Sequence, residues 1–162
     1  MTNSPSRLTT FFVAAALVAI SACTQRPLYY NYAPLPSEGW NARDTLRFLL
    51  PTTEETAAHS LSIGVRATDR ITYRDLWLVA ETRRTPIDAQ ECSPQSRERD
   101  TIHVLLASDR GHWHTSGVVL HETEQFCTNI TTSPHYSTQI LIYHIMATQD
   151  IKGLSEIGVK VQ

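Results

Sequence analysis

The chain has 162 residues, of which 41% are hydrophobic, 8% aromatic and 19% charged, and its formal net charge at pH 7 is -2. This composition is typical of a globular protein and excludes wholesale disorder. The basic residues are scattered, with no cluster beyond Arg83 and Arg84, so we expect no nucleic acid partner.

The first 23 residues predict export and lipidation. Residues 11–22 are uncharged and mostly apolar, Arg7 precedes them, and Cys23 follows. This apolar run is too short to cross a bilayer, as expected of a secretory signal. The sequence of residues 20–23, Ile-Ser-Ala-Cys, resembles the bacterial lipobox, so we predict a lipoprotein signal peptide over residues 1–22 and lipidation of Cys23. Each buried methylene would contribute roughly 0.8 kcal/mol to anchoring. The alternative is a simple cleaved signal with an accidental cysteine.

Removal of the signal leaves 140 residues, enough for one ordinary domain. If Cys23 carries lipid, then Cys92 and Cys127 remain as a pair in an exported protein, where a disulfide is favoured. Such a bridge would stabilise the fold by roughly 3–4 kcal/mol in the chain-entropy model. The alternative is two separate thiols.

Along the mature chain, residues 23–39 predict a lipidated, extended tether, because three prolines and three tyrosines lie within residues 27–36. The domain is then expected over residues 40–162. Alternation and apolar runs predict strands at 45–50, 59–66, 76–82, 101–107, 113–121, 139–146 and 157–161. Helical turns are expected only at 53–58 and 150–154, and a solvated loop at 83–100.

Seven or eight short strands separated by polar turns are typical of an all-β fold. We therefore predict an antiparallel β-sandwich, of jelly-roll or immunoglobulin-like type. No internal repeat is apparent.

Residues that carry chemistry form no convincing site in the sequence. His112 and His114 have the spacing of two ligands on one strand face, and His121 or His144 could complete a metal site, but solvent-exposed histidines are the favoured interpretation. No nucleophile motif and no phosphate-binding glycine loop occurs. We therefore expect no enzyme activity, no catalytic residue, no metal and no cofactor.

Two further features allow functional interpretations. Trp40, Trp77 and Trp113 would form a glycan-stacking platform if their rings were exposed together, although core or edge positions are favoured. Thr45 and Thr101 each lie between an aspartate and an aliphatic residue, which resembles the O-glycosylation acceptor of exported Bacteroidetes proteins. Chance is the alternative for these short sequences.

Several segments together resemble the GldH family of gliding motility lipoproteins. The most specific are Val65-Arg66 followed by the Tyr73 to Leu78 segment, and the turn from Asp109 to Trp113. The similarity extends over about residues 40–159 and includes the lipobox.

This resemblance implies a non-enzymatic lipoprotein of the Bacteroidetes outer membrane. Its implied partners are the membrane, through the lipid anchor, and other envelope proteins of a motility and secretion complex. Because the residues after Cys23 lack the acidic run that resembles a surface-export signal, we expect the protein to face the periplasm. Partner binding is expected at an edge strand or at the 83–100 loop.

Overall fold

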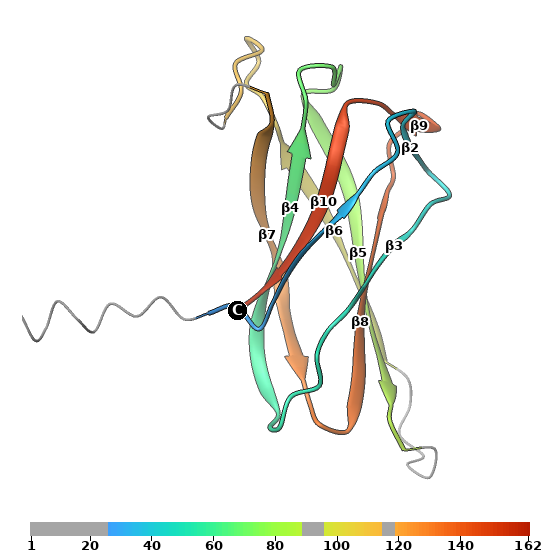
Figure 1. Cartoon of the computed structure of the whole chain (residues 1–162), viewed down its shortest axis with the longest axis vertical. Helices are drawn as coiled ribbons and strands as arrows, with labels where there is room; N and C mark the ends of the chain where they lie inside the picture. The colour runs from blue at the N-terminus through green and yellow to red at the C-terminus, as the bar shows by residue number, and fades with distance from the viewer. Residues whose placement is uncertain (1–25, 89–95, 115–118) are drawn as a thin grey trace, which may run out of the picture.

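The computed structural model describes residues 26–88, 96–114 and 119–162. Cys23 and Cys92 lie outside the described residues. The described part contains ten strands, shown in Figure 1. They are β1 (Tyr29–Pro34), β2 (Trp40–Asn41), β3 (Leu46–Leu49), β4 (Ala57–Ala67), β5 (Asp75–Pro86), β6 (Ser96–Leu105), β7 (His121–Thr132), β8 (Tyr136–His144), β9 (Asp150–Ile151) and β10 (Leu154–Val161).

The strands pair into two four-stranded antiparallel sheets and one small ribbon. The first sheet has the order β1-β10-β4-β7, the second has the order β3-β8-β5-β6, and β2 pairs with β9. The predicted all-β, sandwich-like fold is confirmed. Among the described residues, no helix has the length and apolar character needed to cross a membrane.

The core lies between the two sheets because their strands alternate in polarity. In the first sheet, Leu61, Ile63 and Val65 of β4 are completely buried, and the residues between them face outward. In the second sheet, the inner side chains include Leu76, Leu78, Ile140 and Ile142. Burying each of these side chains contributes roughly 1.5–3 kcal/mol.

Trp40 closes one part of this core from the short β2–β9 ribbon. Its indole Nε1 donates a 3.2 Å hydrogen bond to the Asp44 carbonyl, and its ring meets the His144 ring edge-on at 5.2 Å. The His144 Nε2 lies 3.1 Å from the Trp40 carbonyl oxygen. Burial lowers the pKa of His144, against the smaller opposing effect of that hydrogen bond, so the imidazole is held neutral as part of the packed interior.

The predicted loop at 83–100 is wrong at both of its ends, in residues 83–86 and 96–100. β5 continues to Pro86 and β6 begins at Ser96, with Arg84 paired to Ser96 across the hairpin. Arg84 also donates a 2.5 Å ion-paired hydrogen bond to Glu98. Charged side chains therefore continue the β5–β6 hairpin by pairing across it, where the sequence shows no apolar alternation.

Other differences also concern polar strands. The structure assigns β7 to a segment that had no strand prediction beyond its first residue, because this edge strand contains mostly polar residues. The strand expected at 113–121 is wrong in its described part, where Trp113 makes only an isolated bridge to Ala107. The helical turns are also wrong: β4 begins at Ala57, and residues 150–154 include β9 and the start of β10.

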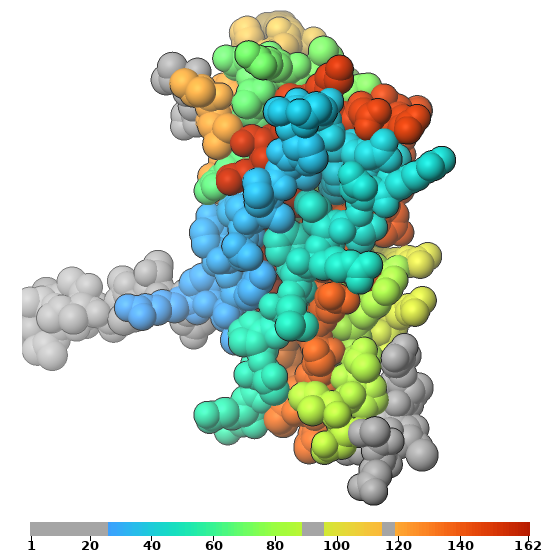
Figure 2. All heavy atoms as spheres, turned by 45° about the vertical axis from the view of Figure 1, so that its right-hand side comes forward, coloured from blue at the N-terminus to red at the C-terminus, as the bar shows by residue number. Residues whose placement is uncertain are grey.

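The segment at 29–34, which we expected to be part of the tether, is the edge strand β1 and pairs with β10 along its whole length. Tyr29 and Ala33 pack against the core, and Leu28 immediately before the strand does the same. Figure 2 shows residues 26–40 in blue beside the following segment in teal, covering one side of the sandwich. The opposite side is closed by contact between β6 and β7.

Replacing Ile63 with Ala is expected to lower the free energy of unfolding by about 2–5 kcal/mol, because it leaves a cavity between the sheets. Urea denaturation followed by circular dichroism measures the change. The matched control is Ile87→Ala, since Ile87 is half exposed just beyond β5. Equal losses in the two variants would contradict the assignment of the core.

Candidate functional site

Tyr32 fastens β1, the first strand of the domain, across the outer face of the first sheet. Its side chain lies over Gly158 of β10 and Gly64 of β4 and donates a 2.8 Å hydrogen bond to Glu122 of β7. A Cβ atom on Gly158 would lie 2.6 Å from the ring, and one on Gly64 would lie 2.0 Å from the hydroxyl oxygen. The two glycines therefore create the space in which the Tyr32 side chain extends from β1 over β10 to β4, where its hydroxyl meets the Glu122 side chain of β7.

Arg66 completes this arrangement, which we call the tyrosine clamp (Tyr32, Gly64, Arg66, Glu122, Gly158). Its guanidinium carbon lies 3.8 Å from the centre of the Tyr32 ring, and its Nε pairs with Glu122 at 3.0 Å. Its Nη1 pairs with Glu156 of β10 at 2.6 Å. The stacked cation and the shared carboxylate hold the phenol on both its face and its hydroxyl.

The electrostatics of the clamp favour the protonated phenol. Burial raises the pKa of Tyr32, and the hydrogen bond to Glu122 raises it further. The hydrogen bond to Glu156 raises the pKa of Arg66. Burial alone would raise the pKa of Glu122, but hydrogen bonds from Tyr32 and Arg66 lower it overall. A proton donor held this firmly is suited to a structural role and not to proton transfer.

A buried charge lies on the outer face of the second sheet. Glu81 of β5 is only 1% exposed and accepts hydrogen bonds from Arg83 on its own strand and from Arg99 on β6, the latter at 2.5 Å. Burial raises the pKa of Glu81, but the two arginine hydrogen bonds outweigh it and hold the pKa below its usual value of 4.5. Its two partners satisfy this carboxylate.

The histidines do not come together. In the part of the chain that the structure describes, no group of three or more His, Cys, Asp or Glu side chains has the arrangement of a metal site. His112 and His114 are exposed, His144 is in the core with Trp40, and His121 pairs with Asp69. The two-histidine spacing on one strand thus leads to no shared ligand set.

Two histidine–aspartate pairs occur among the described residues, His103 with Asp75 and His121 with Asp69, and the second lies beside a pocket. The His121 Nε2 lies 2.9 Å from Asp69 Oδ1, and the imidazole stacks on the Trp113 ring at 3.8 Å. The other ring nitrogen, Nδ1, is buried and has no hydrogen-bond partner among the described residues. A nucleophile cannot reach that nitrogen. The pair therefore has a structural role, in which His121 holds the segment around Trp113 by ring stacking.

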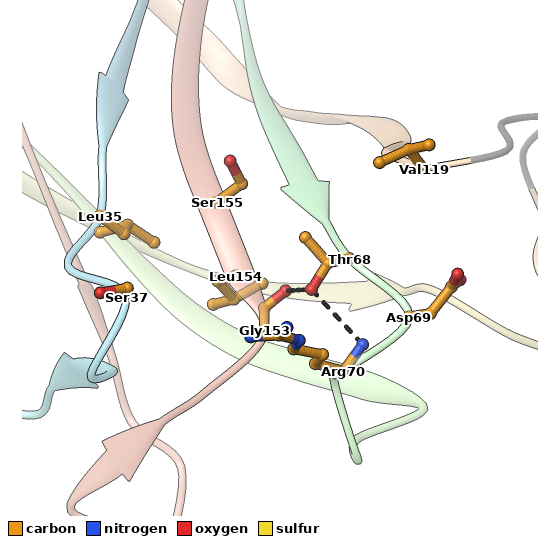
Figure 3. Close-up of a pocket in the computed structure, with 9 residues that line it drawn as sticks. All are labelled: Leu35, Ser37, Thr68, Asp69, Arg70, Val119, Gly153, Leu154 and Ser155. Atoms are coloured by element: carbon orange, nitrogen blue, oxygen red, sulfur yellow. Dashed lines mark hydrogen bonds between the residues drawn. The ribbon is translucent and has the colours of Figure 1, made fainter.

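A pocket of about 460 Å³ lies beside this pair at the end of β4 (Figure 3). Its floor is fixed by Gly153, whose carbonyl accepts hydrogen bonds from the amide and hydroxyl of Thr68 at 2.8 and 3.1 Å. Gly153 has φ +87°, and a Cβ there would lie 2.3 Å from the Ile71 nitrogen. Of its lining side chains only Asp69 and Arg70 are ionisable, so the pocket has no convergent set of reactive groups.

The three tryptophans occupy separate environments. Trp40 is buried in the core, Trp77 is exposed on the outer face of the second sheet, and Trp113 lies on His121. A glycan platform formed by all three rings is therefore not assembled, and the glycan-binding alternative lacks the geometry it requires.

The predicted modification residues remain predictions. Thr45 is exposed just before β3 and Thr101 is exposed on β6, so both are accessible. Cys127 lies on β7, where burial raises the pKa of its thiol to about 12 and nearby Asp100 contributes to the increase. Its predicted partner Cys92, like the lipidation residue Cys23, lies outside the described residues.

The family model of the GldH lipoprotein matches residues 27–161, which include every described strand. The chain belongs to the GldH lipoprotein family. No curated protein matches it. Membership in a lipoprotein family implies that this GldH-family chain is anchored to a membrane by lipid, and the family is not a known enzyme family. The resemblance that the sequence shows is therefore confirmed, and it extends to β1.

Sequence reasoning missed the tyrosine clamp. The signal was present as a tyrosine-rich strand at residues 29–32 and as isolated glycines between outward-facing polar residues in β4 and β10. Only the register of the first sheet places Tyr32 opposite Gly158, and Gly158 opposite Gly64.

Replacing Gly158 with Ala is expected to displace Tyr32 and lower the free energy of unfolding by about 1–3 kcal/mol, because the new methyl group overlaps the ring. A double-mutant cycle with Tyr32→Ala, followed by chemical denaturation, measures the interaction free energy between the two positions. In the Tyr32→Ala background the Gly158→Ala change is expected to cost much less. Strictly additive losses would contradict the clamp.

Glu81→Gln is expected to reduce the loss of stability in acid. Because the pKa of Glu81 in the folded state lies below its unfolded value of about 4.5, the ionised group stabilises the fold above that pH. This contribution disappears as the pH falls through the folded pKa. Denaturation curves between pH 7 and pH 3 should show that the free energy of unfolding falls less steeply with pH in the variant. The part of the pH dependence that comes from Glu122 should remain. Unchanged slopes would refute the role of Glu81.

Proposed function

We propose that this protein is a non-enzymatic, lipid-anchored accessory or scaffold component of gliding motility and the associated protein secretion machinery. The observation that carries the proposal is the family match over residues 27–161. The lipobox-like sequence ending at Cys23 supports the anchor, and the absence of an acidic run at residues 24–28 supports an outer-membrane location facing the periplasm.

The distance between the anchor and the domain is short. Leu28 already packs against the core, and Cys23 lies five residues earlier. A fully extended chain spans at most about 3.3–3.6 Å per residue, which limits the distance between Cys23 and Leu28 to roughly 18 Å. The lipid would therefore hold the sandwich beside the leaflet and raise its effective concentration for partners in the same membrane.

The geometry of the described surface supports binding more than catalysis. The pocket at the end of β4 has two ionisable lining residues, and arginines engage both the buried carboxylate of Glu81 and the exposed carboxylate of Glu122. Rigid sheets with internally paired charges are suited to presenting a fixed surface to another protein.

Deletion of the gene is expected to reduce both spreading on agar and the amount of exported protein in the culture medium, and wild-type complementation should restore both. A deletion strain that spreads and secretes normally would refute the proposed role. A defect in only one of the two would narrow it to that process.

Cys23→Ser is expected to abolish lipidation and release the protein from the membrane fraction. Labelling with a fatty acid followed by mass spectrometry of the mature amino terminus measures this. The matched control, Cys127→Ser, should keep the lipid because Cys127 lies within β7. Full lipidation of the Cys23→Ser variant, or complementation of the deletion strain by a released form, would contradict the anchoring mechanism.

A further inference from the structure

We propose that the outer face of the second sheet is a docking face for an acidic surface of another envelope protein. This inference rests on the proposed scaffold function and names the surface through which it would act. The docking face is defined by an apolar patch of Trp77, Leu105 and Ile145 and by a basic patch of Arg47, Arg83, Arg97 and Arg99.

The apolar patch leaves three large side chains in water. Trp77 is 44% exposed, Leu105 is 41% exposed and Ile145 is 48% exposed. They come from β5, β6 and the end of β8, and the Ile145 amide donates a 2.9 Å hydrogen bond to the Trp77 carbonyl. A tryptophan among exposed aliphatic side chains is typical of the centre of a protein interface.

The tryptophan is already held in position. Its ring stacks on His103 at 4.4 Å, and His103 Nε2 lies 2.8 Å from Asp75 Oδ2. The Trp77 amide donates to the Met146 sulfur at 3.3 Å. A side chain fixed in this way loses little conformational entropy when a partner covers it.

The basic patch lies next to the apolar patch along the same strands. The register places Arg47 and Arg99 in one row across the sheet, and Arg83 and Arg97 in the next. Four guanidinium groups here accompany the carboxylate of Glu81, which is already bound by two of them, while Asp75 on the same face lies beside the apolar patch and pairs with His103. Arg47 and Arg97 form no ion pair with any described residue. Their guanidinium groups therefore remain available to bind carboxylates of a partner.

The chemistry of the partner follows from this distribution. The whole chain has a net charge of -2, and the outer face of the first sheet carries three glutamates against Arg66 and Lys160. Positive charge is thus gathered on the docking face of a chain that is acidic overall, which favours an acidic partner. The strand nearest the lipid anchor, β1, belongs to the other sheet, so we assign this face to a protein and not to the leaflet.

The experiment places a photo-crosslinking amino acid at Leu105 in the full-length, lipidated protein in its native envelope. The matched control carries the same group at Phe126, an apolar residue at least as accessible on the first sheet. We expect an adduct from position 105 to a different protein, with aspartate or glutamate in the crosslinked peptide, and a much weaker adduct from position 126.

Two sets of variants test the chemistry. Trp77→Ala, and the pair Arg47→Glu with Arg97→Glu, should each lower the adduct yield about tenfold or more. Neither set removes a partner of Glu81, and lipidation together with an unchanged thermal midpoint would verify that they fold. Reversing the acidic residues of the captured peptide to arginine should restore the adduct with the Arg47→Glu and Arg97→Glu protein.

An adduct to lipid, to a second copy of this chain, or to a peptide without carboxylates would overturn the proposal, as would unchanged yield in the variants. If deletion of the gene abolishes spreading but position 105 gives no adduct, the docking face alone would be overturned. If position 105 gives an adduct to an acidic protein but the deletion strain spreads and secretes normally, the motility role would be overturned and the docking face would remain supported.

Discussion

Pairing between the first and last strands organises this domain. β1 lies antiparallel to β10 from Tyr29 opposite Val161 to Pro34 opposite Glu156. The first and last described strands therefore lie side by side at one edge of the first sheet, and the other described strands come between them in the sequence. The paired strands are far apart in the sequence, so bringing them together costs loop-closure entropy. Tyr32 adds a side-chain connection from this edge strand to β10, β4 and β7, which compensates for pairing on one side only.

The two outer faces use arginine-paired carboxylates differently. On the first sheet, Glu122 receives the Tyr32 hydroxyl and Arg66, so that four strands share one polar network. On the second sheet, Glu81 gathers Arg83 and Arg99 above buried Val79 and Leu141, which lie outside the main core cluster. Hydrogen bonds outweigh the cost of burial in both networks and keep the carboxylate ionised, from Arg83 and Arg99 for Glu81 and from Tyr32 and Arg66 for Glu122. The first network fastens an edge strand, whereas the second leaves guanidinium groups directed to solvent.

Much of the fold was predictable because several strands carry their burial pattern in their own residues. Leu61, Ile63 and Val65 alternate with polar or small residues, and residues 140–142 form a continuous apolar run in a central strand. The strand β7 was not predictable by alternation, since its inner face includes Thr123 and Gln125 beside only a few apolar residues. The β5–β6 extension was missed for a related reason: Arg84 and Glu98 are individually polar and stabilise the hairpin only as partners.

The candidate site was less predictable than the fold because its meaning depends on register. The sequence shows a tryptophan at position 77 in an apolar run, which indicates burial, yet inward-facing Leu76 and Leu78 turn Trp77 outward. The same one-residue alternation sets Arg97 and Arg99 on the outer face with it. In an isolated sequence an exposed tryptophan and a buried one look alike, and only the pairing of β5 with β6 and β8 separates them.

The arrangement also bears on how anchoring and docking would coexist. The lipidated end would lead directly into β1 of the first sheet, and the docking face belongs to the second sheet, with the packed core between them. The two attachments therefore do not compete for the same side chains. If Cys23 carries the lipid, the five residues from Cys23 to Leu28 would limit the separation of the domain from the leaflet to roughly 18 Å. A protein anchored in this way can remain in the membrane plane while its second sheet engages a neighbour, which is the geometry that a scaffold requires.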